Sequence, residues 1–207
     1  MPELSMDSES ISTVYGQNYA LVHKNFFANE KISVLSWNRI LNLFRLAKSK
    51  NAVQFYSFAT CSINIDKIKD ESEIFSFITD KIINKISEIY PDKNTSSQIS
   101  ISFVGKNDNI IKDDEALEFK KIFEKINPYP VPKNFPPKEI LDPPIFSYPT
   151  DTFFIQFQGS SIWKIKGTYL NEEYILESGD VIFIHKNLNH SVEYLSSGSI
   201  ASISFSD

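Results

Sequence analysis

The chain has 207 residues and a hydrophobic content of 42%, which is enough for one domain with a packed core and argues against wholesale disorder. Its formal charge is −5 and its only arginines are Arg39 and Arg45, so the composition disfavours a nucleic-acid-binding surface. A single cysteine, Cys61, excludes an intramolecular disulfide and a cysteine-based zinc site. Because the sequence has neither signal-peptide features nor an apolar run of membrane-spanning length, we expect a soluble cytoplasmic protein with no membrane partner.

The first 126 residues carry helix and strand patterns behind a polar start. Residues 1–12 are acidic and aperiodic, which predicts a flexible N-terminal tail in front of one domain, residues 13–207. Apolar residues are continuous or alternate in three predicted strands, at residues 19–23, 52–58 and 98–103. They recur at helical spacing in three predicted helices, which run from Ser36 through Ala47, from Glu71 to Tyr90 before Pro91, and from Asp113 through Ile126.

Residues 127–149 interrupt these patterns, because they hold eight of the ten prolines of the chain. Proline suits neither a helix interior nor a central strand, so the stretch predicts an extended connector within the domain. The alternative is that it serves as a proline-rich ligand for an aromatic groove of another protein.

From Asp151 onward the sequence is almost entirely of β character. Short apolar or alternating segments separated by glycines predict strands at residues 153–158, 161–166, 173–177, 181–185, 191–194 and 200–205. Closely spaced strands with glycine turns indicate an antiparallel sandwich or barrel. With the preceding helices, the predicted fold class is α+β.

Three segments in this region form a recognisable set. Phe153 to Gly159 contains an aromatic-x-Gln-x-x-Gly pattern, with Trp163 four residues beyond the glycine. The stretch Leu176–Ile184 contains a Gly-Asp turn, and the stretch His185–Val192 contains a second histidine. Together they resemble the Jumonji C (JmjC) type of cupin, the jelly-roll domain of Fe(II)- and 2-oxoglutarate-dependent protein hydroxylases. The resemblance covers residues 145–207 and, more weakly, 19–47, and it implies a double-stranded β-helix with about three flanking helices.

The departures from the family pattern concern the metal site. Aligned on Gln156 and Gly159, the frame places Phe146 and Tyr148 where the family has the histidine and the acid of its H-x-D motif. Neither side chain supplies the imidazole or carboxylate of an iron-binding facial triad, so only His190 matches a ligand position. Ser161 falls where many relatives have a lysine that pairs with 2-oxoglutarate. We therefore expect neither a metal nor a cofactor.

An alternative set of ligands is Asp151, His185 and His190, which would rebuild a displaced site for Fe(II) with 2-oxoglutarate as cosubstrate. Asp151 falls three residues beyond the acid position, and His185 lies five residues before His190. The simpler interpretation makes Asp151 a strand-entry acid and His185 a strand-end residue. It makes His190 a hydrogen-bonded residue of a pocket.

Two functions follow from the resemblance and its departures. The first is a non-catalytic JmjC-like pseudoenzyme that binds a peptide or protein partner through Phe146, Tyr148, Trp163 and His190, and that presents a precursor peptide to modifying enzymes. The second is a Fe(II)/2-oxoglutarate-dependent peptide or protein hydroxylase with the displaced site. A scaffold subunit without a pocket is a third alternative. Because relatives often dimerise, homodimer formation is left open.

Overall fold

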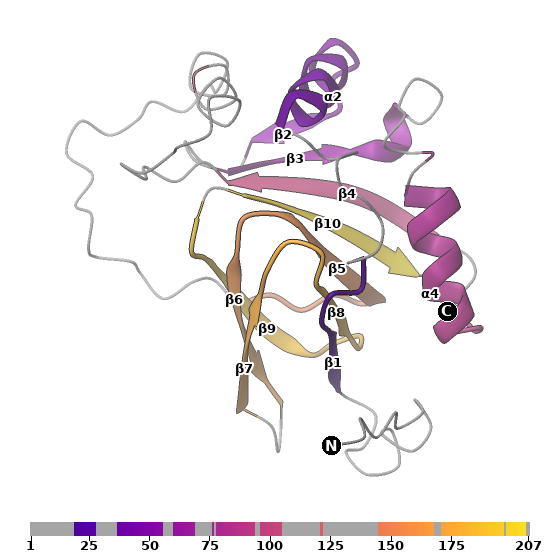
Figure 1. Ribbon diagram of the computed structural model, residues 1–207, viewed down its shortest axis with the longest axis vertical. Helices are drawn as coiled ribbons and strands as arrows, with labels where there is room; N and C mark the ends of the chain where they lie inside the picture. The colour runs from indigo at the N-terminus through magenta and orange to yellow at the C-terminus, as the bar shows by residue number, and fades with distance from the viewer. Residues whose placement is uncertain are drawn as a thin grey trace, which may run out of the picture.

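Two antiparallel sheets face each other in the structure, a computed structural model that describes residues 19–27, 37–55, 60–68, 76, 78–93, 96–104, 121, 145–167, 171–196 and 198–205. The larger sheet has seven strands in the order β1-β8-β5-β10-β4-β3-β2 (Figure 1). These strands are β1 (Ala20–His23), β2 (Val53–Phe55), β3 (Thr60–Asn64), β4 (Ser96–Val104), β5 (Asp151–Gln158), β8 (Val181–Ile184) and β10 (Gly198–Phe205). The smaller sheet has the order β7-β6-β9 and comprises β6 (Ser161–Lys166), β7 (Asn171–Leu176) and β9 (Asn189–Tyr194).

The seven-stranded sheet mixes strands from both halves of the sequence. β10 pairs with β4 on one side and with β5 on the other, so the N-terminal strands continue the C-terminal ones in one sheet. β3 was not predicted, although Cys61 and Ile63 are buried at alternate positions in it. Its short length and its polar Ser62 and Asn64 gave too weak a signal between two longer patterns.

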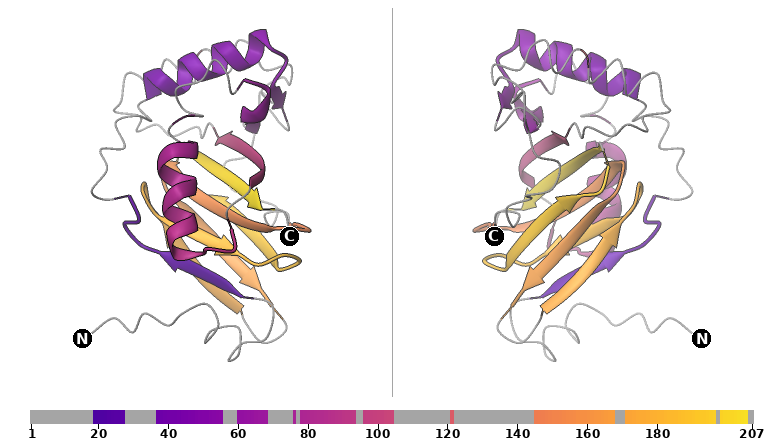
Figure 2. Two further views of the ribbon diagram at one scale, coloured as in Figure 1. Left: turned by 90° about the vertical axis from the view of Figure 1, so that its right-hand side faces the viewer. Right: turned by 90° about the vertical axis from the view of Figure 1, so that its left-hand side faces the viewer.

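Two α-helices of the described part lie on the outer side of the large sheet (Figure 2). α2 (Trp37–Ser49) buries Leu43, Phe44 and Ala47 against it, and Phe44 and Ala47 belong to the predicted apolar face. Of the helix predicted for residues 71–90, the structure describes Ser76 and all residues from Ile78 onward. It begins as a π-helical stretch, Ile78–Ile83, continues as α4 (Asn84–Ile89), and ends before Pro91 as predicted.

Three predicted segments fall mainly outside the described residues. They are the tail of residues 1–12, the third helix from Asp113, of which only Lys121 is described as helical, and residues 127–144 of the connector. Within the described part, no helix combines the length and apolar character that crossing a membrane requires.

β5 belongs to two hydrophobic cores because both of its faces are covered. Phe153 and Ile155 point to the outer core, which the helices complete, whereas Phe154 points to the inner core between the two sheets. A strand buried on both faces has an almost continuous apolar sequence, as the Phe-Phe-Ile run shows. The inner core also holds Trp163 and Ile165 of β6, and the candidate site lies at its margin.

Candidate functional site

The segment before β5 runs along the start of β9, and this pairing assembles the site. Phe146 and His190 form an isolated antiparallel bridge with two backbone hydrogen bonds, Phe146 N–H to His190 O at 2.7 Å and His190 N–H to Phe146 O at 2.9 Å. The N–H of Asn187 donates to the carbonyl oxygen of Tyr148 at 2.7 Å. The two positions that the family pattern assigns to metal ligands therefore do lie beside His190.

The aromatic site is the cluster of Phe146, Tyr148, Phe154, Trp163 and His190. The His190 ring is stacked with Tyr148, at 5.4 Å between ring centroids, and with Trp163, at 5.8 Å. The ring centroid of Phe154 lies 5.7 Å from that of His190 and 4.7 Å from that of Trp163. The ring centroids of Phe146 and His190 are 6.4 Å apart. All four residues that the sequence predicted for peptide binding thus come together, and Phe154 joins them.

Exposure divides the aromatic site into an outer pair and an inner group. Phe146 and Tyr148 are 44% and 38% exposed, whereas Trp163 and His190 are each 2% exposed. Only the outer pair offers area to a ligand in this conformation. The inner rings support that pair from below, so they act by packing rather than by direct contact.

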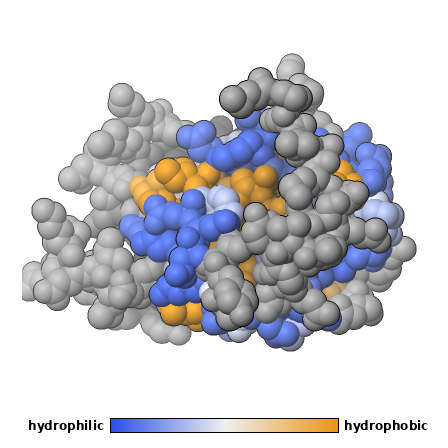
Figure 3. Space-filling model, turned by 90° about the horizontal axis from the view of Figure 1, so that it is seen from below, coloured by the Kyte–Doolittle hydropathy of each residue, from blue (hydrophilic) through white to orange (hydrophobic). Residues whose placement is uncertain are grey.

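The described surface concentrates its exposed apolar side chains near this segment. The large hydrophobic residues that are exposed are Ile89, Ile145, Phe146, Tyr148, Ile175 and Leu195, and half of them lie within residues 145–148. Viewed from below, the molecule shows apolar areas beside hydrophilic ones (Figure 3). Two of these three exposed side chains, Phe146 and Tyr148, are aromatic.

His190 is held in its neutral form. Burial lowers the pKa of His190, opposed by the backbone of Leu188. Nδ1 lies 3.0 Å from the carbonyl oxygen of Leu188, which can only accept, so Nδ1 carries the proton and Nε2 keeps its lone pair. The His190 side chain is therefore a neutral imidazole whose Nε2 can accept a hydrogen bond.

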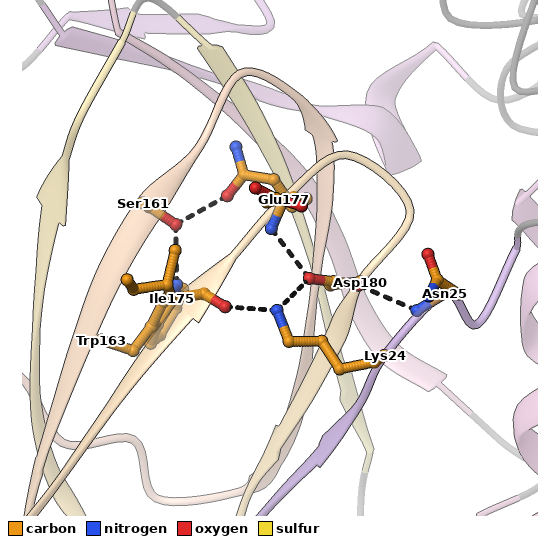
Figure 4. Close-up of polar contacts among 8 residues, drawn as sticks. Lys24, Asn25, Ser161, Trp163, Ile175, Glu177 and Asp180 are labelled. Carbon is orange, nitrogen blue, oxygen red and sulfur yellow. Dashed lines mark hydrogen bonds and ion pairs between the residues drawn. The ribbon is translucent and has the colours of Figure 1, made fainter.

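A buried polar chain fixes the orientation of Trp163 (Figure 4). The Nε1–H of Trp163 donates to Ser161 Oγ at 3.0 Å, and Ser161 Oγ donates to Gln156 Oε1 at 2.7 Å. Gln156 in turn donates through Nε2 to the carbonyl oxygen of Gln158 at 2.6 Å. Ser161 thus serves Trp163 and Gln156, and it provides no positive charge for the carboxylate of 2-oxoglutarate.

The alternative ligand set is not brought together. Asp151 and His185 lie on the outer side of the large sheet, with 3.8 Å between a carboxylate oxygen and Nε2, whereas His190 lies on the inner side. Asp151 accepts from the N–H of Lys186 at 2.8 Å and pairs with Lys93 at 2.9 Å. Among the described residues, no three His, Cys, Asp or Glu side chains are placed to hold a metal ion. The donor set present here does not fit an iron site of the family type.

Sequence reasoning missed Phe154 as a part of the site, and it missed the hydrogen bonds by which Gln156 and Ser161 hold Trp163. A signal existed, because Phe154 and Gln156 are two residues apart on a strand and share a face. The sequence did not tell which of Phe153 and Phe154 faces the inner core. The pairing of β5 with β8 and β10 decides this in the folded chain.

Comparison with known proteins identifies the fold. No protein-family model matches the sequence, and no curated protein matches it. A solved structure of the Escherichia coli ribosomal oxygenase YcfD matches 99% of this chain and 53% of its own, with 16% identity and a TM-score of 0.57. YcfD in complex with cobalt and 2-oxoglutarate matches 98% of this chain and 52% of its own, with 16% identity and a TM-score of 0.56.

The chain therefore spans about half the length of YcfD. At this level of identity the likeness shows the fold, a cupin jelly roll of the JmjC type. The cobalt and the 2-oxoglutarate belong to the YcfD structure.

Proposed function

We propose that this chain, which has a JmjC-type cupin fold, is a non-catalytic domain that binds a peptide or a protein partner at its aromatic site. In finer detail we infer a double-stranded β-helix with three flanking helices. The observation that carries the proposal is the aromatic enclosure of His190, with Phe146 and Tyr148 exposed above it. Aromatic rings bury a large area at low entropic cost, and they are enriched among the residues that dominate binding energy.

The experiment begins with selection of a peptide from a random library displayed on phage, with the purified chain as target. The affinity of the selected peptide is then measured by calorimetry for the native chain and for Tyr148→Ala. The matched control is Ile175→Ala, which removes an exposed apolar side chain from β7, outside the aromatic site. We expect Tyr148→Ala to weaken binding about tenfold or more, near 1.4 kcal/mol, and the control to leave it unchanged.

The second candidate is a Fe(II)/2-oxoglutarate-dependent peptide or protein hydroxylase with a displaced metal site. The observation in its favour is the structural likeness to a ribosomal oxygenase that was solved with cobalt and 2-oxoglutarate. The chemistry at the aromatic site weighs against it, because phenylalanine and tyrosine occupy the two positions next to His190. Measured iron content and turnover of 2-oxoglutarate, with and without the selected peptide, separate the candidates.

A further inference from the structure

β9 has an open edge that begins where the Phe146 bridge ends. His190 directs both its N–H and its carbonyl towards Phe146, so these groups point away from β6. In an antiparallel ladder, successive residues direct their backbone groups to opposite edges. Val192 and Tyr194 therefore direct their N–H and carbonyl groups to the same edge as His190, while Ser191 and Glu193 bond to β6.

Nothing among the described residues pairs with this edge of Val192 and Tyr194. An unpaired row of donors and acceptors is a template for an added strand.

The open edge lies next to the aromatic site. Val192 pairs with Trp163 across the small sheet, and Val192 and Tyr194 pack against the inner core together with Trp163. Burial raises the pKa of Tyr194, and the neighbouring Tyr148 phenol adds to this effect. Directly opposite residues of paired strands share a face, so alternate side chains of an added strand would point towards these rings.

We propose that the partner is an extended peptide that adds a strand to the edge of β9 at Val192 and Tyr194, with an apolar side chain packed against Tyr148. The proposal rests on the proposed function and specifies its binding mode. Main-chain hydrogen bonds supply affinity in such a mode, and the neighbouring side-chain contacts supply selectivity. The edge from Val192 to Tyr194 is short, which suits a peptide anchored by a side chain better than the pairing of two copies of this chain.

The test follows single backbone amides by hydrogen exchange, observed by NMR, with the library-selected peptide as probe. In the free chain, the amides of Val192 and Tyr194 should exchange fast, whereas those of Ser191 and Glu193 should be protected by β6. With the peptide bound, exchange at Val192 and Tyr194 should slow at least tenfold, while Ser191 and Glu193 change little. This alternation distinguishes strand addition from a general rigidification of β9.

A variant removes the edge donor without touching the sheet. Val192→Pro deletes an N–H that does not bond to β6, and proline is tolerated on an edge where its nitrogen faces outward. Val192→Thr is the matched control, because it keeps both the N–H and the β-branched shape. We expect the first variant to weaken the peptide at least tenfold and the second to leave its affinity within about twofold, with the unfolding midpoint of each variant measured alongside.

Three outcomes overturn the inference. If the peptide binds in a Tyr148-dependent way but Val192 and Tyr194 keep exchanging fast, strand addition is wrong while the proposed function stands. If these amides become protected in the free chain as its concentration rises, the edge pairs with a second copy. If no selected peptide depends on Tyr148, the proposed function fails and the inference fails with it.

Discussion

His190 combines three features that act together at the scale of a single residue. Its backbone forms the bridge to Phe146, its Nδ1 bonds to Leu188, and its ring is enclosed by Tyr148 and Trp163. A protonated imidazole would bring a charge into this buried place, where desolvation disfavours it. Burial therefore lowers the pKa of His190 and favours the neutral imidazole.

The expected consequence is a loss of stability in acid. The pKa of His190 is lowered in the folded chain, so the unfolded chain binds more protons once the pH falls below about 6.5. The free energy of unfolding should therefore be constant above this pH and should decrease as the pH falls through the folded pKa. Urea titrations between pH 7.5 and pH 5 check this, and His190→Gln should reduce the pH dependence.

His23 supplies the internal comparison for this measurement. Burial also lowers the pKa of His23, whose Nε2 lies 2.8 Å from the hydroxyl of Tyr90. It should therefore account for the pH dependence that remains in the His190→Gln chain. An unchanged pH dependence in that variant would contradict the assignment of the effect to His190.

At the scale of elements, the Gly179–Asp180 turn ties β1 to the β7–β8 connection. The Asp180 carboxylate is 3% exposed and accepts from Lys24 Nζ at 2.6 Å, from the N–H of Asn25 at 2.9 Å and from the N–H of Glu177 at 2.8 Å (Figure 4). Two of these donors are backbone groups, the N–H of Asn25 and the N–H of Glu177. Gly179, with φ of 95°, allows the tight turn that aims the carboxylate.

Substitution of Asp180 should lower the free energy of unfolding more than substitution of Lys24, its partner in the ion pair. Asp180→Ala removes the buried acceptor that three hydrogen bonds share and should lower the free energy of unfolding by about 3 kcal/mol. The Lys24 side chain is 54% exposed, so Lys24→Met should cost less than about 1 kcal/mol. Urea unfolding of both variants measures the difference, and equal effects would show that the ion pair, rather than the backbone bonds, stabilises the turn.

Elements with a strong local pattern could be predicted from the sequence. Elements whose structure depends on packing against neighbouring elements could not. β6 alternates cleanly, with Ser161, Trp163 and Ile165 buried, and its predicted bounds are those observed. β3 and the π-helical turn at Ile78–Ile83 left no comparable signal. At the site, the family register predicted that Phe146 and Tyr148 lie close to His190. Which rings of the aromatic site are exposed and which are buried depends on packing, so the sequence did not predict it.

At the scale of the whole molecule, this chain shares the JmjC-type fold with an oxygenase about twice its length. In this chain, the bridge between Phe146 and His190 places the segment that precedes β5 beside the first residues of β9. Aromatic rings surround His190 at that place. The difference between an enzyme and a binding domain then depends on a few side chains rather than on the fold.

Metal ions should accordingly leave the stability of the chain almost unchanged. A specific site would stabilise the folded chain by about 2.7 kcal/mol at a metal concentration one hundred times its dissociation constant. Thermal unfolding with Fe(II), Mn(II) or Zn(II), and with a chelator, measures this. A rise in melting temperature that disappears in His190→Gln would establish a metal site and favour the hydroxylase.

The most direct test of the central claim compares Tyr148→Ala with Trp163→Ala in one pair of assays, peptide affinity and urea unfolding. Tyr148 is partly exposed at the rim, whereas Trp163 is buried among the inner rings. We expect Tyr148→Ala to weaken the selected peptide about tenfold or more with little loss of stability. We expect Trp163→Ala to lower the free energy of unfolding by about 3–5 kcal/mol. Unchanged peptide affinity in a folded Tyr148→Ala chain would contradict the claim that the aromatic site binds the partner.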